Sequence, residues 1–185
     1  MRTVSGKVRL YDPIPSFEGA RRWVGGAPPR ADALRGRPLV VHFWSSVCPA
    51  CKEQFDSVRR WVERYGPRGL VVLGVHVRTD PEQRDEDALE AIEAWELSHP
   101  VALDAPDAPL ARRFGVVFVP AYFVFDAAGR LRHRQMGYGA DRGTEAAIER
   151  VLAEMEGAGA PVVASGARAS ASAARAQAAV PEAGA

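Results

Sequence analysis

Two cysteines that lie three positions apart are the residues of this sequence whose type and spacing indicate chemistry. Cys48 and Cys51 are the only two cysteines among 185 residues, and they form a Cys-Pro-Ala-Cys motif. A structural zinc site needs about four ligands, so one cysteine pair is too few unless distant histidines complete it. In a reducing compartment a Cys-x-x-Cys pair is more often catalytic than structural. The pair therefore predicts redox chemistry at two thiols.

The motif follows a segment that is expected to be a buried strand and begins one that is expected to be a helix. Residues 39–44 are apolar on both faces, which is typical of a central strand covered by helices. Pro49 suits the first turn of a helix, and apolar residues then recur at helical spacing up to Gly66. The dipole and the unpaired N–H groups at a helix start stabilise a thiolate. We therefore expect Cys48 to attack and Cys51, one turn further in, to resolve the mixed disulfide.

The remaining elements are predicted to build a mixed sheet around this strand and helix. A strand over 70–77 forms a parallel crossover unit with 39–44. Residues 122–125 and 131–136 alternate about a turn and predict an antiparallel hairpin. A helix with Leu89, Ile92 and Trp95 on one face looks like an addition at the surface. A short strand at 101–103, a short helix at 109–114 and a last helix at 144–155 complete the prediction.

Composition divides the chain into three segments. Residues 1–33 contain many prolines and glycines and predict an irregular N-terminal lead-in, with room for a small hairpin. Residues 34–156 carry the predicted strands and helices and form one domain. Residues 157–185 are mostly Ala, Gly, Ser and Pro. Such a tail buries too little surface to offset the entropy lost on ordering, so we expect it to be largely disordered.

Charge and hydropathy point away from nucleic acid and membranes as partners. The sequence has 24 basic and 23 acidic residues, a formal net charge of +1 at pH 7, so no strong field attracts a polyanion. No run approaches the ~18 apolar residues of a membrane span, and residues 1–16 lack the apolar stretch of a secretory signal. The sequence as given predicts a cytoplasmic protein. Export or membrane tethering is the alternative if a signal precedes the given sequence.

The chain resembles the thioredoxin superfamily over residues 34–155. The resemblance rests on the cysteine motif after the predicted strand and on residues 114–126 (FGVVFVPAYFVFD), which are similar to the family's segment leading through a cis proline into a strand. It implies an α/β thioredoxin fold, with a central mixed sheet flanked by helices. It also implies a cis bond between Val119 and Pro120. The backbone of Val119 would then lie beside Cys48, where an extended substrate can pair with it as an added strand. A trans turn proline is the alternative.

An insertion refines this resemblance. More residues separate Cys51 from Pro120 than in a minimal thioredoxin, and the acidic helix near Leu89 accounts for them. With the run 72–77 and the turn 126–129, the insertion resembles the TlpA-like and DipZ-like branch, which includes redoxins related to the AhpC/TSA peroxiredoxins. The branch implies disulfide exchange with protein disulfides or dithiols and an external thiol reductant. It implies no bound cofactor and no metal.

Several positions depart from the patterns of related enzymes. Thioredoxin has a buried acid six residues before the first cysteine, and here that residue is His42. A histidine can accept a proton near neutral pH, and a neutral core histidine bonded to backbone is the alternative. Gln54 stands where some TlpA-like proteins carry an acid, and Val47 stands where thioredoxin has Trp. Ala50 replaces the histidine of the strongly oxidising DsbA-like enzymes, so we expect an intermediate redox potential.

The places of one tryptophan and three histidines in the sequence also predict where their side chains lie. Trp44, just before the motif, is assigned to substrate binding together with Val119 and Pro120, and its alternative role is to cap the core beneath the site. His76 ends a predicted strand and is expected at the surface, and its alternative is a place overlooking the site. His99 and His133 have polar neighbours and are expected in solvent.

Two other functions compete with disulfide exchange. A peroxiredoxin-like peroxidase is suggested by Ser45, three residues before Cys48, although Val41 occupies the place of that motif's proline. A copper-binding metallochaperone of the Sco type could use both cysteines and a histidine as ligands. Those proteins space their cysteines more widely.

Overall fold

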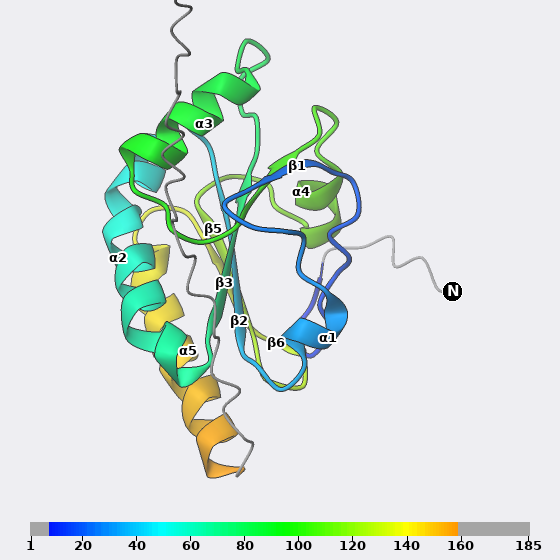
Figure 1. The fold of residues 1–185 in the computed structure, drawn as a ribbon, viewed down its shortest axis with the longest axis vertical. Coiled ribbons are helices and arrows are strands. Elements are labelled where there is room, and N and C mark those ends of the chain that lie inside the picture. The colour runs from blue at the N-terminus through cyan, green and yellow to red at the C-terminus, as the bar shows by residue number, and fades with distance from the viewer. Residues whose placement is uncertain (1–7, 159–185) are drawn as a thin grey trace, which may run out of the picture.

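The computed structural model describes residues 8–158 and contains one six-stranded sheet in the order β1-β4-β3-β2-β5-β6 (Figure 1). The three central strands β2, β3 and β4 run parallel. The strands β1, β5 and β6 each pair antiparallel with their neighbours. The mixed sheet expected from the sequence is thus confirmed. Its strands are β1 (Ala20–Val24), β2 (Leu39–Trp44), β3 (Val71–His76), β4 (Val101–Asp104), β5 (Ala121–Phe125) and β6 (Leu131–Met136).

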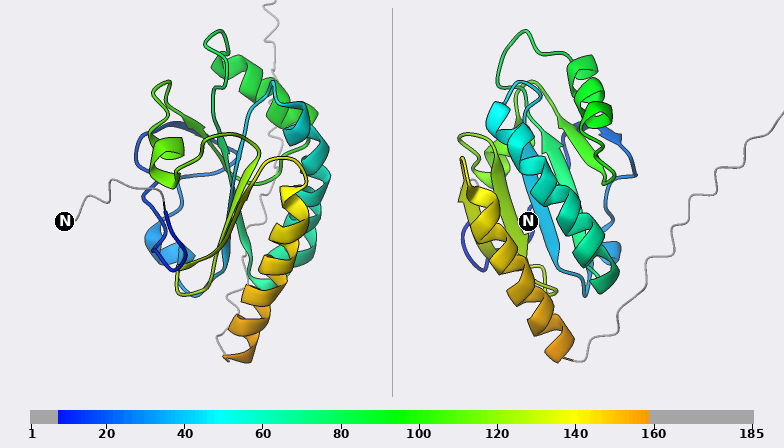
Figure 2. Two further views of the ribbon diagram at one scale, coloured as in Figure 1. Left: turned by 180° about the vertical axis from the view of Figure 1, so that it is seen from behind. Right: turned by 90° about the vertical axis from the view of Figure 1, so that its left-hand side faces the viewer.

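Helices cover both faces of this sheet. The long helices α2 (Pro49–Tyr65) and α5 (Ala140–Gly157) lie side by side on one face, and the short helices α1 (Ala31–Leu34) and α4 (Pro109–Phe114) lie on the other (Figures 1 and 2). A 3-10 turn, η1 (Gly66–Arg68), ends α2. The last helix, α5, begins at Ala140, four residues before the start at residue 144 that the sequence pattern indicated.

The central strand β2 separates two hydrophobic cores. All six of its residues are buried. Val40 and Trp44 belong to the core under α2 and α5, while Val41 and Phe43 belong to the core under α1 and α4. Side chains alternate between the faces of a strand, so His42 points to the α2 side. This double burial explains why the run is apolar on both faces.

The N-terminal segment contributes an edge strand to the main sheet. β1 pairs antiparallel with β4, so the hairpin considered for residues 1–33 is wrong over residues 8–33, which the structure describes. Val8, Ile14 and Phe17 also pack into the core under α1 and α4. Pairing with β4 satisfies backbone N–H and C=O groups of β1. A hairpin would have satisfied them by pairing within residues 1–33. The boundary drawn at residue 34 therefore does not separate two structural units. The tail predicted to be disordered lies, from residue 159 onward, outside the described residues.

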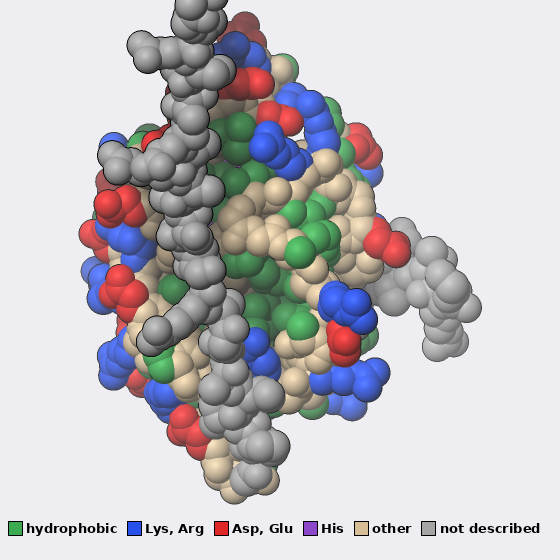
Figure 3. Space-filling view, in the orientation of Figure 1, with side chains coloured by type: hydrophobic (Ala, Val, Ile, Leu, Met, Phe, Trp, Pro, Cys, Tyr) green, Lys and Arg blue, Asp and Glu red, His purple; other side chains and the backbone are tan. Residues whose placement is uncertain are grey.

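A shallow apolar groove accompanies this segment. It is lined mainly by residues 14–20, and Trp23, Pro28, Pro29 and Leu34 complete the lining. Apolar side chains are visible on that face, between β1 and α1 (Figure 3). The groove belongs to the face opposite α2 and α5.

The inserted helix is confirmed as α3 (Asp85–Ala94), which lies between β3 and β4 in the sequence. Ala88 and Ala91 are buried, and Ile92 and Trp95 pack partly buried against the core under α2. A carboxylate of Asp87 accepts the backbone N–H of Arg84 at 2.7 Å and caps the first turn. The insertion is thus docked near the start of α2 rather than projecting into solvent (Figure 1).

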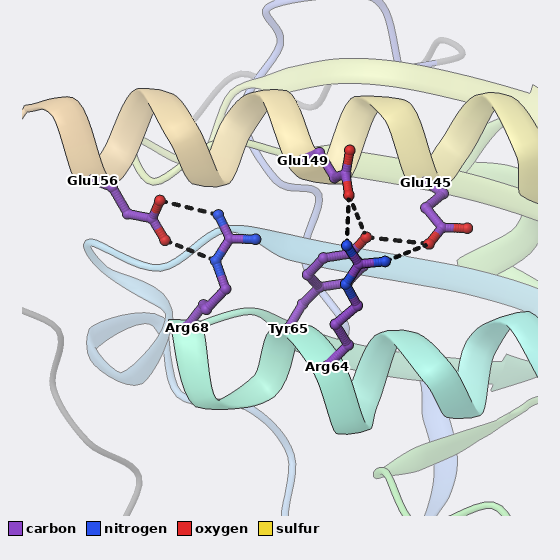
Figure 4. A network of polar contacts seen from close by, with 6 residues as sticks. All are labelled: Arg64, Tyr65, Arg68, Glu145, Glu149 and Glu156. Atoms are coloured by element: carbon purple, nitrogen blue, oxygen red, sulfur yellow. Dashed lines mark hydrogen bonds and ion pairs between the residues drawn. The ribbon is translucent and has the colours of Figure 1, made fainter.

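A polar network joins the C-terminal end of α2, and the η1 turn that follows it, to one side of α5 (Figure 4). The hydroxyl of Tyr65 lies 2.8 Å from a carboxylate oxygen of Glu149 and 3.1 Å from one of Glu145. Burial and these carboxylates raise the pKa of Tyr65, so the hydroxyl stays protonated and donates. Arg68 forms a two-pronged ion pair with Glu156 at 2.8 and 3.0 Å. These contacts hold α5 against α2 at the end of the helix pair remote from the cysteines.

Candidate active site

The cysteine pair lies at the start of α2, as the sequence predicted. Cys48 is the N-cap residue and forms a disulfide with Cys51. Cys48 is half-buried, whereas Cys51 is 2% exposed. The backbone N–H of Cys51 points at the Cys48 sulfur, with the nitrogen 3.1 Å from Sγ. A negative charge on Cys48 would therefore be stabilised by an N–H group and by the positive end of a 17-residue helix.

The loop before β5 faces this sulfur. The peptide bond between Val119 and Pro120 is cis, as the resemblance implied. The Cys48 Sγ lies 3.9 Å from the carbonyl oxygen of Val119. The disulfide sulfur carries no proton, so this is a contact rather than a hydrogen bond. Pro120 itself is buried, so its effect on the site is to direct the backbone of Val119 toward Cys48.

Exposed apolar side chains surround the cysteines in three loops. Val47 is 55% exposed, Val117 66%, Phe118 56% and Tyr138 80%. They come from the loops before Cys48, before Pro120 and after β6. A side chain at Gly137 would come within 3.3 Å of the Phe118 ring, so the last two loops touch. We call these four residues the apolar rim. Sequence reasoning did not predict the rim, although large apolar residues in loops beside a reactive motif are a usable signal.

Trp44 does not reach this surface. It is 1% exposed and packs edge-to-face against Phe55, with Trp95 of the insertion beside it. Its assignment to substrate binding is therefore wrong. Trp44 takes the alternative role of core residue beneath the site, because its position on β2 directs the side chain under α2.

His42 is paired with another histidine inside the core. The two Nε2 atoms of His42 and His99 lie 2.7 Å apart, and the residues are 1% and 4% exposed. The expectation that His99 lies in solvent is wrong, because the chain after α3 returns it over β3. It does so at Gly74, where a Cβ would lie 3.1 Å from His42 Nε2 and 3.2 Å from His99 Nε2. A glycine inside an apolar strand was the signal for this close approach.

The fold holds the histidines of this region neutral. Burial, and then the neighbouring His99, lowers the pKa of His42 well below its usual value. Burial lowers the pKa of His99 to about 4. His76, expected at the surface, is 3% exposed, and burial lowers its pKa to about 4 as well. His133, expected in solvent, is half-buried. In the His42–His99 pair, one ring must carry a hydrogen on Nε2 and donate it in a hydrogen bond to the Nε2 of the other ring.

The described part of the chain holds neither a candidate metal site nor a helix suited to crossing a membrane. Between residues 8 and 158, no three His, Cys, Asp or Glu side chains are grouped so that they could hold a metal ion. In the same range no helix has the length and apolarity needed to cross a membrane.

The two features that carry this site are a cysteine pair at the start of a helix and a cis proline facing it from the next strand of a mixed sheet. They place the chain among the thioredoxin-fold thiol-disulfide oxidoreductases. Within that class, the family model described as Redoxin matches residues 11–152, and the chain belongs to this family.

Known relatives agree with this assignment. Thiol-disulfide oxidoreductase YkuV of Bacillus subtilis is 33% identical over 150 residues, covering 80% of this chain and all of YkuV. Protein DipZ of Mycobacterium tuberculosis is 29% identical over 145 residues, covering 75% of this chain but only 20% of DipZ. The solution structure of a thioredoxin-like protein in the oxidized form superimposes with a TM-score of 0.72 at 31% identity, covering 80% of this chain and 99% of that protein. The DipZ-like branch expected from the insertion is supported.

The buried histidines predict a stability that depends on pH. An unfolded chain would titrate them near 6.5, whereas the fold holds His76 and His99 at about 4. Between these values the unfolded state binds more protons, so the free energy of unfolding rises with pH and levels off above about 6.5. For His76 alone the pKa difference corresponds to about 3 kcal/mol. Urea unfolding measured between about pH 4 and about pH 8 checks this slope.

The control for this slope is a His76→Gln variant. It lacks one of the titrating groups, so its unfolding free energy should rise less steeply over the same pH range. A wild-type profile that is flat between about pH 4 and about 6.5 would contradict neutral burial of these rings.

Proposed function

We propose that this protein exchanges disulfides with protein substrates through the Cys48-Pro-Ala-Cys51 motif and cycles between a dithiol and a disulfide. The observation that carries the proposal is the unequal accessibility of two sulfur atoms that are already bonded to each other. Cys48 is reachable from solvent, while Cys51 is 2% exposed and can reach little besides Cys48. One thiol can therefore attack a large substrate, and the other can complete the exchange.

The exchange takes two steps that conserve electrons. The Cys48 thiolate attacks one sulfur of a substrate disulfide, and the other substrate sulfur leaves as a thiolate that takes up a proton. Cys51 then loses its proton and attacks the Cys48 sulfur, which releases the second substrate thiol. The substrate disulfide is reduced by two electrons, and the Cys48–Cys51 disulfide is formed. An external thiol reductant returns the pair to the dithiol state, and with a dithiol substrate all steps run in reverse.

The surroundings of Cys48 favour an extended polypeptide as substrate. The carbonyl of Val119 faces the sulfur, in a position to accept a hydrogen bond from the backbone of a segment lying beside it. The apolar rim offers contact area for side chains that flank the substrate cysteine. Relatives named thiol-disulfide oxidoreductase and thiol:disulfide interchange protein are consistent with this substrate class. The cytoplasmic location remains a prediction from the sequence.

We also propose that His42 accepts the proton that Cys51 loses. His42 lies on the face of β2 that α2 covers, and the ring of Phe55, one turn beyond Cys51 on α2, meets its edge at a centroid distance of 5.7 Å. The lowered pKa of His42 leaves its ring neutral and able to take up a proton, which it would hold only transiently before passing it on. The hydrogen bond to His99 would share the resulting charge between two rings.

Cysteine replacements test the order of attack. Cys48→Ser is expected to reduce turnover of a disulfide-bonded protein to the uncatalysed rate, because the accessible nucleophile is lost. Cys51→Ser should still attack but should accumulate a mixed disulfide with the substrate, visible as a mass increase in non-reducing mass spectrometry. The assignment fails if Cys51→Ser turns over normally or if the covalent adduct forms through Cys51.

The apolar rim predicts a difference between large and small substrates. Phe118→Ser is expected to lower kcat/KM for a protein disulfide about tenfold, since one large apolar contact contributes 1–2 kcal/mol in the transition state. Reduction of a small aromatic disulfide should change less than about twofold, because it does not span the rim.

The matched control for the rim is Leu10→Ser. Leu10 is also exposed, at 53%. Its neighbour Tyr11 donates its backbone N–H to the carbonyl of Leu131, at the end of β6 remote from the cysteines. Leu10→Ser should change neither kcat/KM for the protein disulfide nor the reduction of the small aromatic disulfide. Equal losses for Phe118→Ser and Leu10→Ser would exclude the rim as the substrate contact.

The proposed proton acceptor is tested by the step that Cys51 performs. His42→Phe keeps an aromatic ring but removes the acceptor, so resolution of a mixed disulfide should slow by about 10²-fold at pH 7, as expected for the loss of a general base. Its rate should then rise with pH over a wider range than in the wild type. A normal resolution rate in a folded variant would assign His42 a structural role only.

A further inference from the structure

A buried glutamine from the insertion holds the turn that leads to Cys48. Gln83 lies between β3 and α3 and is 4% exposed. Its Oε1 accepts the backbone N–H groups of Thr79 at 2.7 Å and Asp80 at 3.0 Å. Its Nε2 donates to the hydroxyl oxygens of Ser45 at 3.0 Å and Ser46 at 2.8 Å. One amide group therefore connects the insertion to two consecutive residues of the catalytic loop.

His76 holds the same turn from the end of β3. Its Nε2 lies 3.3 Å from both the backbone nitrogen and the hydroxyl oxygen of Ser46. The backbone N–H can only donate, so this Nε2 carries no proton and acts as the acceptor. The Ser46 hydroxyl accepts a hydrogen bond from Gln83, and its own O–H can share the His76 Nε2 lone pair with the Ser46 N–H. The Ser45 hydroxyl pairs in addition with Thr79 at 2.9 Å. All side-chain partners of the two serines thus come from residues 76–83, which we call the brace.

The turn that is held in this way determines where the Cys48 sulfur lies. The Ser45 carbonyl accepts the backbone N–H of Cys48 at 3.1 Å. Cys48 in turn places its sulfur 3.1 Å from the Cys51 nitrogen. A shift of the turn would move the sulfur away from this N–H, the donor that can stabilise a thiolate. The brace itself does not touch the sulfur, so its residues are positioning residues.

We propose that the brace, through Gln83 and His76, sets the thiolate reactivity of Cys48 by fixing Ser45 and Ser46. The insertion then acts on the chemistry through the position of the turn, and relatives that differ in this segment would differ in reactivity at an unchanged cysteine motif. The inference rests on the proposed function in one respect, namely that Cys48 is the attacking thiol.

The test is the pH dependence of Cys48 alkylation in the reduced full chain. Rates with iodoacetamide are followed by mass spectrometry, which identifies the labelled cysteine. Gln83→Ala is expected to raise the pKa of Cys48 by about one unit, since losing one hydrogen bond to a charged group costs about 1.5 kcal/mol. The thiolate population at a pH below the pKa then falls about tenfold, and the midpoint potential becomes more reducing.

Two further variants separate positioning from loss of stability. Leu97→Ala removes an apolar side chain of the same insertion that is 8% exposed and packs in the core under α2. It should lower Tm and leave the pKa of Cys48 unchanged. Ser46→Ala removes the hydroxyl to which Gln83 donates. It should raise the pKa, and the double variant with Gln83→Ala should raise it less than the sum of the single variants, because both lose the same contact.

The outcomes distinguish this inference from the function on which it rests. The inference is overturned if Gln83→Ala lowers Tm but leaves the pKa of Cys48 at the wild-type value, or if Leu97→Ala shifts the pKa equally. If the wild-type Cys48 already titrates near ~8.5, like a free cysteine, then the activated thiol itself is absent. That result would count against the proposed function as well as against the brace.

Discussion

The active site is organised around the first turn of α2, where the backbone N–H of Cys51 meets the sulfur of Cys48. The Cys51 N–H faces the Cys48 sulfur because Cys48 is the N-cap residue of α2, and α2 begins a few residues after β2 ends. Burial of β2 on both faces holds the strand in place beneath this turn. The cis bond before Pro120 then brings a second loop to the same sulfur. Reactivity therefore depends on the junction of a rigid strand and a helix, rather than on the two cysteines alone.

The insertion between β3 and β4 is joined to this junction at both of its ends. On entry it supplies Gln83, which bonds to the turn before Cys48, and on exit it supplies His99, which bonds to His42 of β2. Each bond satisfies a polar group that would otherwise be buried without a partner. Leaving such a group unpaired costs about 1–3 kcal/mol. Trp95 adds apolar contact beneath the same loop. An addition that looked peripheral in the sequence is therefore part of the support of the site.

Much of the fold and the core of the site followed from local signals. Apolar runs, the helical spacing after Pro49 and the turn at 126–129 located the main strands and helices to within a few residues. The resemblance of residues 114–126 to a known segment was enough to predict the cis peptide bond. Apart from the hairpin expected near the N-terminus, the errors concern polar or amphipathic residues near element ends, namely Trp44, His76 and His99. Their burial depends on which distant segment covers them, and sequence neighbours do not identify that segment.

Local sequence patterns were enough to establish the class of chemistry, because two thiols at a strand-to-helix junction have few other uses, and to establish the order of the secondary-structure elements. The residues that support that chemistry became apparent only from the folded arrangement of the chain. It paired His42 with His99 across Gly74, turned Trp44 into the core, added β1 to the far edge of the sheet and brought Gln83 under Ser45 and Ser46. The physical reason is that hydrophobic periodicity and backbone propensity act over a few residues. The partner of a buried polar group, by contrast, is set by how the whole chain packs.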